Sequence, residues 1–192
     1  MKKLKLVLTA SVAFLISLCS FAQSSKMSMK KETTVMVGGA AMYPSKDIVS
    51  NAVNSKDHTT LVAAVKAAGL VETLQSAGPF TVFAPTNSAF NMLPMGTVDN
   101  LLKPENKSML SGVLTYHVVS GKLYAKDIAK MIKDGKGSAT LSTVAGGKIM
   151  LSMEGMKLAI LDEKGGKAYV TIKDVNQSNG MIHVLDHVLL PK

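Results

Sequence analysis

Hydrophobic positions recur every three or four residues in several stretches of the first two thirds of the chain, a spacing typical of amphipathic helices. These stretches lie at residues 47–53, 58–68, 70–75, 87–92, 106–115 and 127–133. Thr86 is placed to cap the helix at 87–92, and Gly69 to end the helix at 58–68. The pattern therefore predicts a group of short helices.

The last third of the chain has a different pattern, in which short β-like runs are separated by glycine-containing turns. Five such runs lie at residues 139–143, 148–153, 158–162, 169–175 and 181–190. Their spacing of roughly ten residues predicts an antiparallel meander. In the last run both alternating sets are apolar, which predicts a strand covered on both faces. Two further strands are expected at 80–84 and 116–119. Helices followed by strands indicate an α+β domain.

The N-terminus has the layout of a cleavable secretory signal in residues 1–22. Three lysines precede an uncharged run from Leu6 to Cys19, and Ser20-Phe21-Ala22 offers small residues at the cleavage site. A membrane anchor is the first alternative, but the run is shorter than the roughly 20 residues of a spanning helix. Lipidation of Cys19 is the second, although Leu18 stands where a small residue is needed. We therefore expect a protein secreted to the periplasm or outside the cell, with no transmembrane segment after cleavage.

Residues 23–42 are expected to form a flexible N-terminal segment, because they begin with a polar stretch rich in Lys, Ser and Met. The domain itself is then expected to cover residues 43–192. A length of this order is typical of one domain with a sufficient core of its own. Cys19 is the only cysteine and lies in the expected signal, so disulfides are not expected in the mature chain.

The positive charge of the chain, +9 in total, does not indicate nucleic-acid binding. Every basic residue is lysine, and arginine, which grips phosphate and guanine in two places, is absent. The lysines are also spread along the chain. A solvated basic surface with weak attraction to anionic cell surfaces is the favoured interpretation.

Catalytic motifs are missing from the sequence. It contains no nucleophile elbow, no phosphate-binding loop, no zinc-protease motif and no pair of acids spaced for glycoside chemistry. We expect a non-enzymatic protein that needs no cofactor.

Four histidines raise the question of a metal site. His183 and His187 lie in the predicted last strand, where four residues span about 13 Å, too far for one ion. His117 could approach His183 in the fold, but no carboxylate stands at a metal-site spacing. We interpret the histidines as core or edge residues and expect no metal.

The chain also contains 13 methionines. Several fall where they would pack into or flank the sheet, namely Met92, Met95, Met150, Met153, Met156 and Met181. Methionine fills irregular cores and also lines adaptable binding surfaces. Core filling and an apolar groove for a partner or ligand are the two interpretations.

Three segments resemble the signatures of the fasciclin (FAS1) family. Residues 81–90 (TVFAPTNSAF) are similar to the first signature, residues 116–119 (YHVV) to the central Tyr-His motif, and residues 179–191 (NGMIHVLDHVLLP) to the second signature. Their order and spacing agree with the family. The resemblance implies a wedge-shaped β-sandwich flanked by short helices, and an adhesion or surface-interaction function. Its partner would be a cell-surface or matrix protein or a polysaccharide.

The resemblance also implies a partner-binding surface. Carried over position by position, it consists of Tyr116 and His117 with Asp174 and Val175. The residues before Asp174 are Ile172 and Lys173, where the family has an acidic residue and a proline. From its place near the end of a strand, Asp174 is expected to be solvated and dispensable for folding.

A carrier of an apolar small ligand, such as a carotenoid, is the rival function. Some fasciclin-like proteins resemble such carriers, and a composition rich in Met and Val suits an apolar pocket. The small number of aromatic residues, 5% of the chain and without tryptophan, argues mildly against it.

Overall fold

The computed structural model describes residues 33–192. The expected signal peptide at 1–22 and the polar stretch up to residue 32 lie outside the described residues. None of the described helices is long and apolar enough to cross a membrane.

The expectation of a flexible segment up to residue 42 is wrong for its last part. Val35–Val37 (β1) and Ala40–Met42 (β2) form an antiparallel hairpin. Gly38 and Gly39 make its two-residue turn with φ of 56° and 77°, values that glycine adopts without strain. Both Val37 and Met42 are buried in the hydrophobic core. The hairpin therefore belongs to the domain, and the Gly-Gly pair was the signal for it.

The predicted helices are present, with three additional short elements, one at residues 56–58 and two near residue 100. Between residues 48 and 116 the helical elements are Ile48–Ala52 (α1), Lys56–His58 (η1), Thr59–Ala68 (α2), Val71–Gln75 (α3), Asn87–Asn91 (α4), Thr97–Leu101 (α5), Pro104–Asn106 (η2) and Lys107–Tyr116 (α6). The side chain of Thr86 accepts a hydrogen bond from the amide of Ala89, and Gly69 ends α2 with a φ of 73°. Both end signals predicted from the sequence are thus confirmed.

Seven strands form one sheet in the order β4-β3-β9-β8-β7-β6-β5. The strands are Phe80–Pro85 (β3), Val118–Ser120 (β4), Ser138–Ser142 (β5), Lys148–Glu154 (β6), Lys157–Leu161 (β7), Lys167–Gln177 (β8) and Gly180–Leu185 (β9). The meander from β5 to β9 is antiparallel, as predicted, and β3 pairs with β9 in parallel. The last strand ends at Leu185, five residues earlier than expected. The α+β class is confirmed.

The long strand β8 bends and joins two parts of this sheet. Its first residues pair with β7, its last residues pair with β9, and the register shifts between Val170 and Ile172 and again before Val175. The turn after β5 reaches the far edge of the sheet, where the amide of Val144 donates to the carbonyl of Val118 at 2.8 Å. The sheet is therefore curled, and two hydrophobic clusters pack against it.

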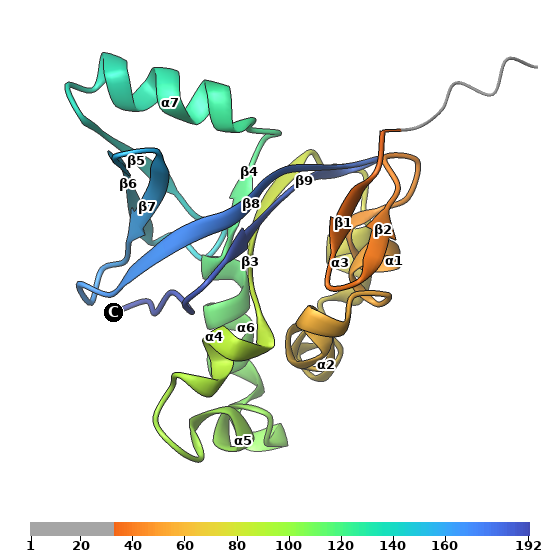
Figure 1. Ribbon diagram of the computed structural model, residues 1–192. Helices are drawn as coiled ribbons and strands as arrows, with labels where there is room; N and C mark the ends of the chain where they lie inside the picture. The colour runs from red at the N-terminus through yellow and green to blue at the C-terminus, as the bar shows by residue number, and fades with distance from the viewer. Residues whose placement is uncertain (1–32) are drawn as a thin grey trace, which may run out of the picture. The chain divides into compact units, whose positions relative to one another are not determined.

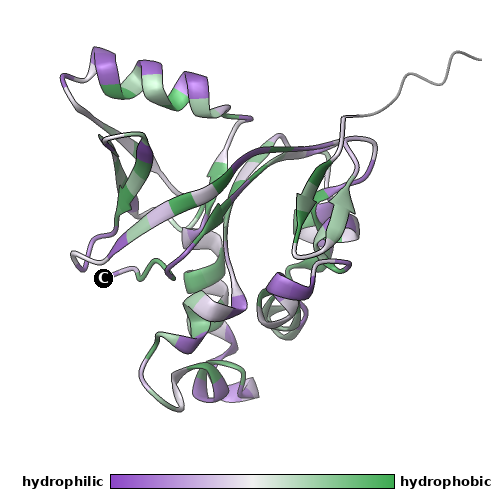
Figure 2. Ribbon diagram, viewed as in Figure 1, coloured by the Kyte–Doolittle hydropathy of each residue, from purple (hydrophilic) through white to green (hydrophobic). Residues whose placement is uncertain are grey.

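Strand β3 separates these two clusters by simple alternation. Val82 and Ala84 point into the cluster beneath the helices α1 to α6, whereas Phe83 is fully buried in the cluster between the two parts of the sheet. Figure 1 shows α7 (Ala125–Asp134) over β5, β6 and β7, and the helices α1 to α3 near the other end of β8 and β9. In Figure 2, α7 carries both hydrophobic and hydrophilic bands. Ile128 and Ile132 are its buried residues.

Candidate functional site

Tyr116, which the family resemblance marks for partner binding, lies in the interior. It is the last residue of α6 rather than the first of a strand, and its side chain has no exposed surface. Its hydroxyl donates to the carbonyl oxygen of Lys148 at 2.7 Å and accepts from the amide of Glu163 at 3.1 Å. Burial raises the pKa of Tyr116. The side chain thus fastens α6 to the first residue of β6 and to the turn that precedes β8.

His117 is also buried, and both of its ring nitrogens bond to the backbone. Nδ1 lies 2.8 Å from the carbonyl oxygen of Val113, and Nε2 accepts from the amide of Leu189 at 2.9 Å. This pattern requires the neutral ring with its proton on Nδ1. Burial lowers the pKa of His117 to about 4, because the charged form cannot be hydrated there. The ring ties the end of α6 to the C-terminal segment.

His183 plays an equivalent part in strand β9. Its Nε2 lies 3.0 Å from the carbonyl oxygen of Leu123, and its Nδ1 accepts from the amide of Asp174 at 3.3 Å. Its ring stacks on Phe83 with 5.7 Å between centroids, and burial lowers the pKa of His183. Backbone groups therefore engage both ring nitrogens of His117 and of His183, and residues 33–192 contain no cluster of three metal-ligating side chains. His187 lies beyond the end of β9, not within it, and contacts Asp186.

Asp174 and Val175 occupy the bend of β8. Val175 is fully buried. Asp174 has a φ of 60°, the left-handed conformation that Asp and Asn tolerate better than other side chains. Its carboxylate accepts a hydrogen bond from the amide of Ala125, the first residue of α7, at 2.7 Å. The expectation that Asp174 is merely solvated is therefore wrong, because it fixes the start of α7.

The four residues of the expected partner surface do not form one exposed patch. Tyr116, His117 and Val175 are inside the domain, where a partner cannot touch them without unfolding it. Asp174 alone is partly exposed. The first three hold backbone segments or fill the core, and only Asp174 borders an open surface.

That surface is a groove of about 670 Å³, which we call the α7 groove. Its walls are the first turns of α7, the β6–β7 hairpin, and the bent strand β8 with the residue that follows β9. The exposed side chains that line it include Lys126, Met153, Met156, Lys157 and Lys173. Tyr169 also lines it and is half-buried. The volume of the groove lies in the range typical of ligand sites, about 300 to 1,000 Å³. The sequence did not predict it, because its residues come from segments that are far apart in the chain.

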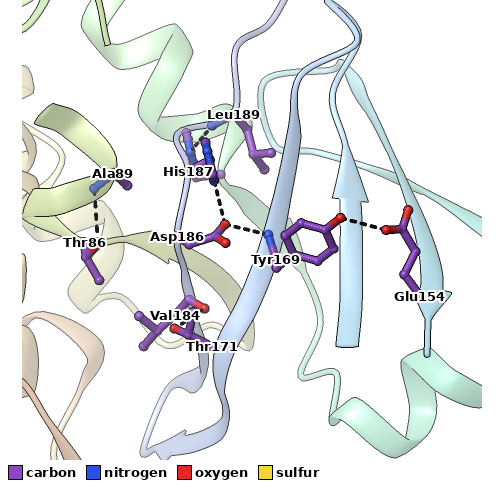
Figure 3. A network of polar contacts seen from close by, with 10 residues as sticks. Thr86, Ala89, Glu154, Tyr169, Thr171, Val184, Asp186, His187 and Leu189 are labelled. Carbon is purple, nitrogen blue, oxygen red and sulfur yellow. Dashed lines mark hydrogen bonds and ion pairs between the residues drawn. The ribbon is translucent and has the colours of Figure 1, made fainter. Parts of the chain in front are cut away.

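A polar network surrounds Tyr169, one of the residues that line the groove (Figure 3). The amide of Tyr169 donates to Asp186 at 2.7 Å, and its hydroxyl donates to Glu154 at 2.7 Å. Glu154 also pairs with Lys167 at 2.6 Å, and the hydrogen bonds from Lys167 and Tyr169 lower the pKa of Glu154. The ammonium of Lys157 lies over the Tyr169 ring, 5.7 Å from its centroid. The ring is thereby held in one orientation.

The excess positive charge of the described residues lies in the half that carries this groove. Residues 33–121 contain five lysines and five acidic residues, whereas residues 122–192 contain eleven lysines and seven acidic residues. Lysines are spread along the whole sequence, but among the described residues they outnumber the acidic residues only in residues 122–192. All residues that line the groove thus belong to the part of the chain with an excess of lysine.

The methionines are divided between the two interpretations. Met181 has no exposed surface and fills the core. The other five that were singled out are 41% to 103% exposed, which contradicts core filling for them. Of these, Met153 and Met156 line the α7 groove.

Small apolar cavities lie beneath the helices of the described residues, and two of them are the candidates for a ligand. One of about 70 Å³ lies between α1 to α3, β3 and α6, and one of about 30 Å³ lies beside His58. An engineered cavity of about 150 Å³ binds benzene, so neither cavity has room for a long apolar pigment. No observation on the described residues favours the carrier function.

Comparison with known proteins agrees with the sequence signatures. The family model of the fasciclin domain matches residues 56–191 of the sequence. The chain belongs to the fasciclin domain family. Protein sll1483 of a Synechocystis strain is 42% identical over 95% of this chain and 93% of its own length. The immunogenic protein MPB70 of Mycobacterium bovis is 35% identical over 72% of this chain and 65% of its own length.

The fold of this fasciclin domain is found in a solved structure as well. A FAS1 domain pair from the insect cell adhesion molecule fasciclin I matches with a TM-score of 0.69 at 21% identity. The match covers 77% of this chain and 52% of that one. It confirms the expected fold class.

Proposed function

We propose that this fasciclin domain is an exported, non-enzymatic adhesion or surface-interaction module that holds its partner in the α7 groove. The observation that carries the proposal is the groove itself. It is about ten times larger than the apolar cavity between α1 to α3, β3 and α6, it is lined by exposed lysine and methionine side chains, and its residues belong to the part of the chain with an excess of lysine. Such a surface suits contact with a cell-surface or matrix component more than the enclosure of a substrate.

Family membership supports the same class of function. The structurally similar FAS1 domain pair belongs to a protein described as a cell adhesion molecule. The secretory layout of residues 1–22 supports export to the periplasm or beyond, where such contacts are made.

The test is an adhesion assay with two matched triple variants. In the groove variant, Lys126, Lys157 and Lys173 are replaced by glutamine. In the control variant, Lys56, Lys103 and Lys107, which are exposed on the helical half, are replaced in the same way. Beads coated with parent or control protein should adhere to native cells or matrix, and beads coated with the groove variant should adhere much less. Equal adhesion of the two variants would contradict the assignment of the groove.

A further inference from the structure

The three groove lysines have no anionic partner among the residues that the structure describes. Within residues 33–192 the ion pairs are Lys167 with Glu154 and His187 with Asp186, so Lys126, Lys157 and Lys173 pair with no carboxylate there. All three are exposed and line one groove, although they come from α7, β7 and β8. Ammonium groups gathered in a concave surface raise the local concentration of anions.

The groove also presents hydrogen-bond acceptors. Asp174 and Asp186 line it, and each uses one carboxylate oxygen for a backbone amide, those of Ala125 and Tyr169. The other oxygen of each carboxylate has no donor among the described residues. A carboxylate accepts hydrogen bonds only, so the ligand that satisfies these oxygens must carry donors beside its anionic groups.

The combination of unpaired lysines and free carboxylate oxygens distinguishes between classes of polyanionic ligand. The side chains of an acidic peptide are acceptors only when ionised, and would be repelled by Asp174 and Asp186. Nucleic acid would call for the two-pronged grip of arginine, which is absent from the chain. An acidic polysaccharide has carboxylate or sulfate groups for the lysines and hydroxyl donors for the aspartates. The half-buried Tyr169, held between Glu154 and Lys157, adds a flat apolar surface for a sugar ring.

We propose that the α7 groove binds a segment of an acidic polysaccharide, whose anionic groups contact Lys126, Lys157 and Lys173 and whose hydroxyls donate to Asp174 and Asp186. This inference rests on the proposed function and names the chemistry of its partner. Because the lysines are exposed, the attraction is screened by salt.

Calorimetry on the protein without its signal tests the inference with defined probes. A heparin tetrasaccharide and a galacturonate tetramer are the anionic probes, cellotetraose is the neutral probe, and hexaglutamate is the peptide probe. At least one anionic sugar should bind with one site per chain, more tightly than cellotetraose or hexaglutamate. Its affinity should fall about tenfold or more in the groove triple variant, and little in the control triple variant.

Three results would overturn the inference. The first is absence of binding by both anionic sugars, the second is an equal loss of affinity in the two triple variants, and the third is tighter binding of hexaglutamate than of either sugar. The adhesion assay separates these results from failure of the proposed function. If groove variants lose adhesion while no acidic sugar binds, the groove remains the adhesion surface and only the polysaccharide assignment fails.

Discussion

The carboxylate of Asp174 accepts a hydrogen bond from the amide of Ala125, 49 positions away in the sequence, at 2.7 Å. Ala125 begins α7, so a negative charge meets the end of a helix where unsatisfied amides and the helix dipole favour it. The amide of Asp174 in turn bonds to His183. One residue thereby connects the wall of the groove to the bend of β8 and to the last strand.

This contact predicts that Asp174→Ala is destabilising. The change removes the acceptor for the amide of Ala125. It also places alanine, which has no polar side chain to form a local hydrogen bond, at a φ of 60°. We expect a loss of about 1–3 kcal/mol in the free energy of unfolding. Asp174→Asn is the control, because asparagine keeps an oxygen acceptor and tolerates the left-handed conformation. Urea unfolding measures both, and equal stability of parent and Asp174→Ala would contradict the capping role.

The buried His117 predicts that the domain loses stability in mild acid. Its pKa is about 4 in the folded protein and about 6.5 when unfolded, so between these values the unfolded chain binds more protons. Stability is therefore fully present above about pH 6.5 and falls as the pH drops towards 4. For His117 alone the loss is of the order of 3 kcal/mol.

Burial lowers the pKa values of His58 and His183 too, and both therefore add losses of the same sign. Unfolding by urea at intervals between pH 7 and pH 4.5 measures the combined slope. A His117→Asn variant has one titrating group fewer and should show a shallower slope. A parent protein whose stability is flat over this interval would show that these rings are not buried as neutral groups.

Gly180 follows Asn179, and an Asn-Gly pair is typical of a turn in which the glycine has a positive φ. The structure gives a different reason for a glycine at this position. Its φ is not positive, in contrast to ten other glycines of the domain. A Cβ at this position would instead collide with the carbonyl oxygen of Phe80 and touch Ile48. The parallel strands β3 and β9 start side by side here, with Phe80 opposite Gly180.

We therefore expect Gly180→Ala to cost about 1–3 kcal/mol, since the backbone of β3 must move. Gly112 supplies the matched control, because it lies inside α6 and a Cβ there would meet nothing within 4 Å. Gly112→Ala should stabilise the domain by up to about 1 kcal/mol through helix propensity. Thermal melts of the two variants should thus shift in opposite directions, and similar shifts would contradict the collision.

Local sequence patterns predicted the helices and strands whose side chains alternate regularly between the core and solvent. The alternation around Phe83, the cap at Thr86 and the end at Gly69 are all local signals, and each is found in the structure. The final strand was predicted too long because Leu189 is fully buried although it is not in a strand. Apolar residues of an irregular segment fill the core as well as those of a strand do.

The candidate site could not be predicted in this way. Lys126, Lys157 and Lys173 are exposed, so they are not part of any hydrophobic pattern in the sequence. They lie in one groove only because β8 bends and α7 packs beside it. The family signatures directed attention to Tyr116 and His117, which are buried. Such signature positions report what the fold needs. Of the four residues carried over from the family, only Asp174 borders the open surface.

Tyr116 offers a final test that separates structural from binding roles. Tyr116→Phe keeps the ring in the core but removes the hydroxyl that joins Lys148 and Glu163. Two backbone groups would then lack a partner, and we expect a loss of about 1–3 kcal/mol. Tyr43 is the control, because it is 41% exposed, so Tyr43→Phe should be close to neutral.

The two roles differ in what happens to adhesion. Tyr116 does not line the α7 groove and has no exposed surface, so a folded Tyr116→Phe protein should adhere to cells or matrix as well as the parent does. Bead adhesion would be measured at a temperature well below the midpoint of its thermal melt, so that both proteins are folded. Loss of adhesion by the folded variant would show that the Tyr-His segment takes part in binding after all. Retained adhesion together with a lowered melting temperature is the expected result, because the hydroxyl acts on the packing of α6 and not on the partner.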